Sequence, residues 1–297
     1  SPMHVLSPST VRNFFDVQVT DTNVTRSIPP YMSGAYASNR VFGGNIVAQA
    51  MKSFVSFVPS VVVLGVNYKF IAAGKMEVPL EFRVHVEEEE EKLGIAVITA
   101  LQNGKVIGMG HIRYSHSIPD HLDSSHFVCP EYIQDPLSYA SANEALTTMT
   151  DKRMALVVRV LNSSVVETRG LHTPHTHPAP RVFFWLRIKP HLADLLIPQD
   201  GLFVALFFSD FAVLEVGTDL YEMNGHSVQN AASLHHSVWI HETQLDPRGF
   251  YCMVHECQTI ANARLRVESR LFNEQRKCVV SVVQEGYFLR GPDKAKL

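Results

Sequence analysis

The residue that most invites a chemical interpretation is Asp210. It lies within residues 202–216, LFVALFFSDFAVLEV, where twelve of the fifteen residues are apolar. An ionised carboxylate in such surroundings must be neutralised, hydrogen-bonded or reached by water, because burying it unpaired is very costly. Carboxylates perturbed in this way gather at functional sites. Asp210 is therefore a candidate catalytic residue, although it could instead cap a local turn with Ser209 or bond a backbone amide in the core.

Two further polar residues are candidates for the same site. In residues 278–290, CVVSVVQEGYFLR, strand alternation places Gln284 on the same face as Val280 and Val282. A buried amide needs a hydrogen-bond partner, so Gln284 is expected to meet another polar group inside the fold. Ser233, at the head of SLHHSVW, is the third candidate, but the local pattern alone does not favour it over Ser237.

A helix and a set of antiparallel strands must position these residues, and the sequence predicts such a unit twice. Apolar residues at three- and four-residue spacing predict a helix over 41–58, and the apolar run 202–216 predicts a second one. Two-residue alternation and turn pairs such as Asn103-Gly104 predict the strands. These strands are 80–86, 94–102 and 105–114 after the first helix, and 233–242, 248–260, 263–271 and 278–290 after the second.

The repeat predicts that the 297 residues divide into two units. A helix that is apolar on all sides can be buried by an antiparallel sheet that curves around it, so each unit is expected to be of the α+β class. The second unit, with Asp210, Ser233 and Gln284, is expected to carry the catalytic group, and to open with a strand at 155–160. The expected boundaries are 1–116 for the first unit, 117–154 for a linker rich in Pro, Ser and Asp that ends in a short helix, 155–291 for the second unit and 292–297 for a tail.

Composition restricts the classes of function. The formal net charge of −3 lacks the basic excess of a protein that binds nucleic acid. No apolar run reaches the roughly eighteen residues of a membrane helix, and residues 1–15 lack the basic and apolar segments of a secretory signal. The four cysteines show no disulfide-scaffold spacing, which fits a reducing compartment. We therefore expect neither nucleic acid nor a membrane as a partner.

Three clusters could hold a metal ion in principle, but for each of them an explanation without metal is favoured. Cys252 and Cys257, on either side of His255, are five residues apart and so point to opposite faces of a strand. The histidines of residues 172–178, HTPHTHP, lie in an expected loop with no adjacent Cys or acidic residue. The acidic run 87–91 is typical of a solvated surface. No metal site is therefore predicted.

The last three residues, Ala295, Lys296 and Leu297, resemble the small-basic-Leu signal that directs proteins into the peroxisomal matrix. Such a signal is read only at a free C-terminus. The expected partner is then the peroxisomal import receptor, and the expected location is the peroxisomal matrix.

Five segments of the chain resemble one protein family: SDF, SLHHSVWIHE and VVQEG, in this order, and, nearer the start, RVFGGNIVAQA and LQNGKVI. The family that they resemble is the acyl-CoA thioesterase II family, which includes peroxisomal acyl-CoA thioesterases, and the last two segments are similar to its first domain. The likeness extends from about residue 41 to residue 290. It implies two hotdog domains in one chain, a double hotdog, each with a long central helix wrapped by a curved antiparallel sheet.

The resemblance also implies an activity and its residues. It implies hydrolysis of acyl-CoA thioesters to fatty acid and CoA, without a cofactor, by a water that Asp210, Ser233 and Gln284 activate. The first residues of the first helix, Gly43, Gly44 and Asn45, are expected to bind substrate. The first half departs from the family at Asn67, Ala72 and Ala73, where relatives commonly carry a His and an Arg-Pro, and at KLGIAVI, so CoA contacts cannot be transferred from those positions.

Two other functions remain open at this point. The altered first half would also suit a non-catalytic protein that binds acyl-CoA or regulates its use. A hotdog enoyl-CoA hydratase is less favoured, because its Asp is usually followed closely by a His, and the next His after Asp210 is His226. In either case the chain is expected to associate into a homo-oligomer through exposed sheet edges.

Overall fold

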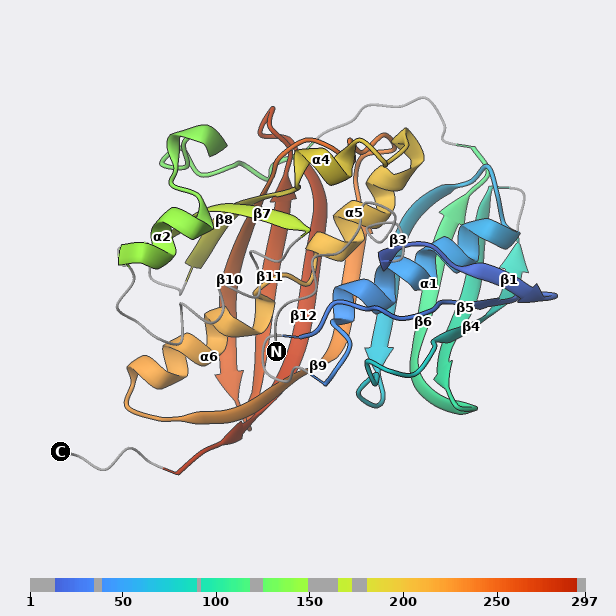
Figure 1. Cartoon of the computed structure of the whole chain (residues 1–297), viewed down its shortest axis with the longest axis horizontal. Helices are drawn as coiled ribbons and strands as arrows, with labels where there is room; N and C mark the ends of the chain where they lie inside the picture. Colours follow the sequence, from blue (N-terminus) through green and yellow to red (C-terminus); the bar gives the residue numbers. More distant parts are fainter. Residues whose placement is uncertain are drawn as a thin grey trace.

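A computed structural model describes residues 14–34, 39–89, 92–117, 125–148, 165–172 and 181–292. The described chain forms two halves that lie side by side, the N-terminal half in blue and cyan and the C-terminal half in yellow to red (Figure 1). In the N-terminal half the elements are β1 (Gln18–Asp21), β2 (Val24–Arg26), α1 (Gly43–Phe57), β3 (Val62–Phe70), β4 (Glu81–Glu89), β5 (Leu93–Gln102) and β6 (Lys105–Ser115).

The C-terminal half has a similar composition of elements and is preceded by two short helices. Those helices are η2 (Pro136–Ser138) and α2 (Ala142–Thr148). The half itself consists of β7 (Val166–His172), β8 (Arg181–Ile188), α4 (Pro190–Ala193), η3 (Pro198–Asp200), α5 (Gly201–Phe208), α6 (Val213–Met223), β9 (Val228–Ile240), β10 (Tyr251–Ala261), β11 (Arg264–Phe272) and β12 (Cys278–Arg290).

One antiparallel sheet runs through both halves. Its strand order is β1-β2-β4-β5-β6-β3-β9-β12-β11-β10-β8-β7. The halves join where β3 pairs with β9, from Gly65 opposite Trp239 to Lys69 opposite His235. The predicted α+β class is confirmed, and the three strands predicted after the first helix and the four predicted after the second are present. The strands β1, β2, β3, β7 and β8 were not predicted.

The alternating pattern in β4 shows how the sequence sets the core. Phe82 is fully buried and Val84 is 5% exposed, as the prediction of one apolar strand face requires. Val86, expected on the same face, is 38% exposed, because the register of β4 against β5 shifts between Val86 and Glu88. The core face therefore ends at Val84.

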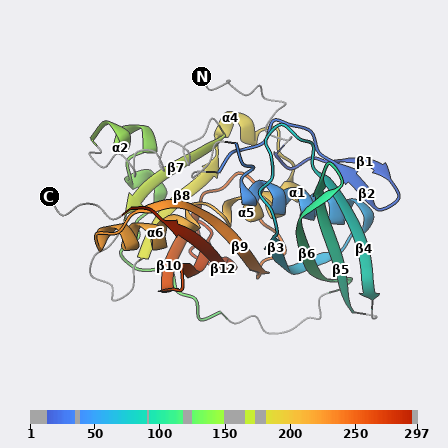
Figure 2. The ribbon, with the colours of Figure 1, turned by 90° about the horizontal axis from the view of Figure 1, so that it is seen from below.

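The helices lie on the inner face of the sheet. The first helix, α1, packs against β4 and β5, and α6 packs against β9, β10, β11 and β12. Figure 2 shows α1 within the curve of the N-terminal strands, with α5 beside it and α6 over the C-terminal strands. Because α1 also packs against α5, the first turn of α1 lies close to the C-terminal end of α5. The predicted helix over 41–58 is thus present as α1.

The prediction of one continuous helix over 202–216 is wrong. The segment forms α5 and α6, separated by a break at residues 209–212. Ala212 adopts a left-handed conformation, with φ of 54°, which a helix cannot contain. The apolar run hides this break, because residues on both sides of it are buried regardless of their backbone conformation. As a result Asp210 lies in a turn between two helices and not on a helical stripe.

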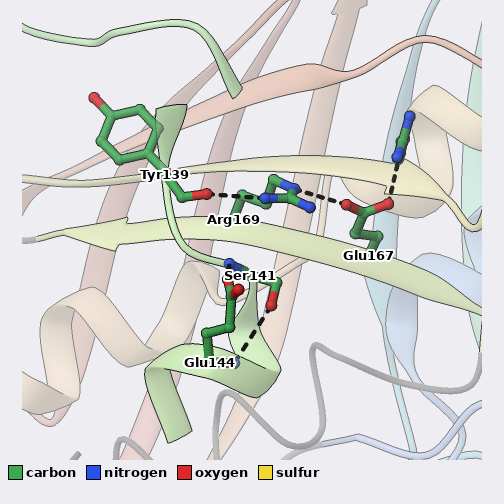
Figure 3. Close-up of polar contacts among 6 residues, drawn as sticks. Tyr139, Ser141, Glu144, Glu167 and Arg169 are labelled. Carbon is green, nitrogen blue, oxygen red and sulfur yellow. Dashed lines mark hydrogen bonds and ion pairs between the residues drawn. The ribbon is translucent and has the colours of Figure 1, made fainter. Parts of the chain in front are cut away.

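The region between the halves includes a segment, residues 125–148, that packs on the sheet surface opposite to the helices. Cys129 and Ile133 are buried there against Phe183 and Trp185 of β8. Figure 3 shows the polar contacts of its second part: Arg169 of β7 donates to the carbonyl oxygen of Tyr139 at 2.9 Å and bonds Glu167 at 2.7 Å. The short helix predicted at the end of the linker is present in this segment as α2. The strand predicted at 155–160 lies outside the described residues. The predicted domain boundaries stay a prediction.

One stretch, Pro198–Glu222, is long and apolar enough to cross a membrane by length and composition, with a mean hydropathy of 1.6. Of its most apolar window, 83% is buried inside the protein. Burial of α5 and of the first part of α6 in the core of the C-terminal half accounts for its apolar character. The expectation that no apolar run reaches about eighteen residues was too strict, because a window of that length is apolar on average even though Asp210 interrupts it.

Candidate active site

A cavity of about 320 Å³ lies between the two halves. Asp210 and Ser233 line it from the C-terminal half. The N-terminal half supplies Gly43 at the start of α1 and Phe70 at the end of β3. Two of the three predicted catalytic residues therefore face one cavity, and the N-terminal half helps to line it.

The first turn of α1 holds the Asp210 carboxylate. The backbone N–H of Gly44 donates to Asp210 Oδ2 at 3.0 Å. The first N–H groups of a helix have no partner within the helix and carry its partial positive charge, so they suit an anion. Both glycines are needed for this approach: a Cβ on Gly43 would lie 2.6 Å from Asp210 Oδ2, and one on Gly44 would lie 2.5 Å from the carbonyl oxygen of Phe207.

Burial makes the Asp210 carboxylate a stronger base than the carboxylate of an exposed aspartate. Its side chain is 9% exposed. Desolvation raises the pKa of Asp210 to about 7, against the opposing effect of hydrogen bonds from Gln284 and from the Gly44 amide. Near neutral pH the group can therefore both accept a proton as carboxylate and return it as carboxylic acid, as a general acid–base catalyst must.

Gln284 links Asp210 to Ser233. Its Nε2 donates to Ser233 Oγ at 2.6 Å and its side chain also bonds Asp210. Gln284 is fully buried and is not among the described residues that line the cavity. The structure thus brings the three predicted residues together, with Asp210 and Ser233 facing the cavity and Gln284 behind them.

Behind Gln284 lies a buried histidine that the sequence reasoning missed. His236 Nδ1 is 2.5 Å from Gln284 Oε1, and its Nε2 is 2.8 Å from Ser209 Oγ. Burial lowers the pKa of His236 to about 4, so the ring is neutral at physiological pH. The only sequence signal was the alternation of β9, which places His236 on the inner face beside Val238.

The hydrogen bonds select one arrangement of protons. Because Nε2 of Gln284 donates to Ser233, its Oε1 is the atom that accepts from His236. A neutral His236 then carries its proton on Nδ1, and the single hydroxyl proton of Ser209 is shared between His236 Nε2 at 2.8 Å and the carbonyl oxygen of Leu206 at 2.6 Å. His236 therefore fixes which end of the Gln284 amide faces Asp210.

The remaining predicted residues have different surroundings. The Asn45 side chain accepts from the N–H of Met32 at 3.0 Å and donates to the carbonyl of Phe14 at 3.1 Å, so it ties the N-terminal segment to α1 and does not line the cavity. His226, which the hydratase interpretation would need, stacks on Tyr221 and is also absent from the described lining.

No group of three or more His, Cys, Asp or Glu side chains within the described ranges could hold a metal ion. His255 is engaged by Ser269 and by the carbonyl of Phe211, and the thiol of Cys257 bonds the carbonyl of Thr259. Residues 173–178 of the HTPHTHP segment lie outside the described residues.

Comparison with known proteins gives a consistent result. The model of the acyl-CoA thioesterase C-terminal domain matches residues 141–288. The chain is similar to acyl-CoA thioesterase 2 of Haemophilus influenzae, with 22% identity over 259 residues that cover 83% of this chain and 87% of the relative.

Solved structures share the fold. The acyl-CoA thioesterase II TesB2 of Mycobacterium marinum superposes with a TM-score of 0.70 at 18% identity, covering 95% of this chain and 98% of that one. A protein of Alicyclobacillus acidocaldarius described as having a hot dog fold superposes with a TM-score of 0.67 at 12% identity, covering 95% and 98%. The expected tandem hotdog fold is therefore confirmed.

Proposed function

Since the chain belongs to the acyl-CoA thioesterase II family, we propose that it hydrolyses acyl-CoA thioesters to a fatty acid and CoA in the cavity lined by Asp210. The observation that carries this proposal is the hydrogen-bonded group of the buried residues Asp210 and Gln284 with Ser233, at the first turn of α1. Thioester hydrolysis needs mainly a positioned water, a base and a donor for the developing oxyanion, and this cavity can offer all three.

In the proposed mechanism a water lies between Asp210 and Ser233. The Asp210 carboxylate takes one proton as the water oxygen attacks the thioester carbonyl carbon. The C–S bond of the tetrahedral intermediate then breaks, and the CoA thiolate leaves and receives the proton that Asp210 holds. Atoms balance with water as the only co-reactant, and the pKa of Asp210 near 7 suits both proton transfers.

The N–H of Gly43 is the donor that we assign to the oxyanion. Gly43 lines the cavity at the first position of α1, where the backbone N–H has no partner within the helix. Gln284 and His236 have positioning roles, because neither lines the cavity among the described residues.

The test is release of free thiol from short, medium, long and branched acyl-CoA esters by the purified chain and by Asp210→Asn. Hydrolysis by the wild type that is lost in Asp210→Asn supports the proposal. Binding of acyl-CoA by the wild type without thiol release would instead support the non-catalytic alternative, and undiminished hydrolysis by Asp210→Asn would remove its assignment as base.

We also propose that Ala295, Lys296 and Leu297, which lie outside the described residues, act as a peroxisomal import signal. A fluorescent protein fused to the N-terminal side of the chain should collect in peroxisomes. The same fusion with one residue added after Leu297 should stay diffuse, and equal import of both fusions would refute the signal.

The expected self-association of the chain is checked on the purified protein by light scattering.

A further inference from the structure

One basic residue, Arg40, lines the opening of the cavity, and a second, Lys75, lies beside Arg40. Arg40 is half-exposed and is a lining residue, and the adjoining lining residues Ile71 and Ala73 are exposed as well. In contrast, the acidic lining residues Asp210 and Glu215 are 9% and 8% exposed and lie at the buried end. The cavity is therefore acidic at its floor and basic at its mouth.

The backbone places a second cation beside Arg40. Arg40 forms an antiparallel bridge with Lys75, and the neighbouring N–H of Val41 donates to the carbonyl of Gly74 at 2.9 Å. Residues that lie directly opposite each other in such a bridge direct their side chains to the same side. Lys75 is exposed, so its ammonium group and the Arg40 guanidinium share the solvent-facing side of this bridge.

Among the residues that the structure describes, neither Arg40 nor Lys75 forms an ion pair with a carboxylate. The ion pairs in that part of the chain are made by other arginines and lysines. Two like charges directly opposite each other are destabilising unless an anion lies between them. The backbone that carries Lys75 is nevertheless firmly held: its N–H donates to Gln102 Oε1 at 2.7 Å and its carbonyl accepts from Gln102 Nε2 at 2.9 Å.

We propose that Arg40 and Lys75 bind the phosphate groups at the nucleotide end of CoA while the thioester lies at Asp210. Phosphate oxygens accept the several donors of a guanidinium and an ammonium group. The acidic floor excludes the polyanionic end of the substrate, so the basic mouth also sets the direction in which the substrate enters. This inference rests on the proposed function, and it assigns CoA contacts to positions different from those at which this chain departs from its relatives.

The experiment compares one acyl chain on two thiols, CoA and pantetheine, the second of which lacks the nucleotide phosphates. For the double variant Arg40→Gln/Lys75→Gln, KM for the acyl-CoA should rise about tenfold or more, whereas KM for the acyl-pantetheine should stay at the wild-type value. A 3′-dephospho-CoA ester shows which phosphate is bound, because loss of the bound phosphate reduces the effect of the substitutions.

Arg113→Gln is the matched control. Arg113 is exposed on β6, and its neighbour Ile112 is fully buried, so Arg113 points away from the cavity face of the sheet. Its kinetics should equal those of the wild type with both esters. An unchanged KM for acyl-CoA in the double variant, or an equal rise with both thiols, would overturn the phosphate assignment.

The outcome is separable from that of the proposed function. If the wild type hydrolyses neither ester, the hydrolase proposal fails, and calorimetric titration with CoA and with pantetheine still tests the cation pair. CoA that binds more tightly than pantetheine to the wild type, with equal binding of both to the double variant, supports the phosphate site. Equal binding of both ligands to the wild type refutes it.

Discussion

At the scale of single residues, the central feature is the carboxyl group of Asp210, whose pKa is higher in the folded protein than in water because the group is buried. Asp210 was recognisable in the sequence because a charge interrupted an apolar run. Its partners were only partly recognisable: Gln284 stood out by alternation and Ser233 by family resemblance, but the Gly44 N–H is a backbone group and leaves no residue type to detect. His236 was hidden because a buried histidine and a surface histidine look alike in a strand of mixed character.

Substitution of Asp210 by Asn should separate activity from stability. Loss of a general base should lower kcat by about 10²–10⁴-fold. The folded-state pKa of Asp210, about 7, lies above the value of roughly 3.9 in an unfolded chain, so the folded state binds the proton more tightly. The free energy of unfolding of the wild type therefore falls as pH rises from about 4 to 7, and Asp210→Asn should be more stable than the wild type at pH 8, by roughly 2–4 kcal/mol.

Thermal unfolding of both proteins at pH 4 and pH 8 measures this effect. The difference in Tm between variant and wild type should be larger at pH 8 than at pH 4. In the wild type, kcat should increase with pH around 7, where Asp210 loses its proton. A rate independent of pH between 5 and 9, with chemistry limiting, would contradict the role of Asp210 as base.

Substitution of His236 tests a positioning role. In His236→Phe, Oε1 of Gln284 loses its donor, and the amide can turn its oxygen toward Asp210. The hydrogen bond that lowers the pKa of Asp210 is then lost, so the pH midpoint of kcat should shift upward and kcat at pH 7 should fall about tenfold with little change in KM. The partly buried neighbour His235, changed to Phe, serves as control. If kcat of His236→Phe falls by the same factor at every pH and the pH midpoint of kcat does not shift, the substitution has only damaged the structure.

At the scale of elements, the decisive feature is the break between α5 and α6. The periodicity of residues 202–216 predicted one helix, because composition reports burial and does not report the conformation of Ala212. Without the break Asp210 would lie on a helical face. With it, the side chain reaches the first turn of α1, so the start of one helix and the interruption of another together make the site.

Gly44→Ala tests how closely these elements must approach. The new Cβ would lie 2.5 Å from the carbonyl oxygen of Phe207, so α1 and α5 would have to separate. We expect a loss of about 1–3 kcal/mol in stability and a lower kcat, because the Gly44 N–H would move away from Asp210. Ser56→Ala, at the exposed far end of α1, should leave both quantities unchanged. Wild-type stability and kcat in Gly44→Ala would show that the contact is not tight.

The strands illustrate a second limit of prediction. Long strands with regular alternation, such as β4, β11 and β12, were predicted from the sequence, whereas β1 and β2 were not. Those two strands have 4 and 3 residues, too few to establish a period. β8 reads as a nearly continuous apolar run, since Trp185 and Phe183 are buried on one face and Phe184 and Leu186 on the other.

At the scale of the whole molecule, the connecting segment 125–148 is held on the outside of the C-terminal half. Arg169→Ala should remove the bond to the carbonyl of Tyr139 and the ion pair with Glu167 (Figure 3). Because this pair is partly exposed, Tm should change little, but amide hydrogen exchange around residues 134–141 should accelerate. Arg264→Ala, which breaks an exposed pair with Glu285, should not affect that segment. Unchanged exchange in Arg169→Ala would show that burial of Ile133 alone holds it.

The ladder between β3 and β9 has a consequence for how the molecule melts. Five residue pairs bridge the halves there, and the core cluster includes residues from both sides, such as Phe54 and Phe208. Unfolding of either half would remove hydrogen bonds and apolar contacts from the other half. Scanning calorimetry should therefore record one cooperative heat-absorption peak for the whole chain, in spite of its repeated architecture.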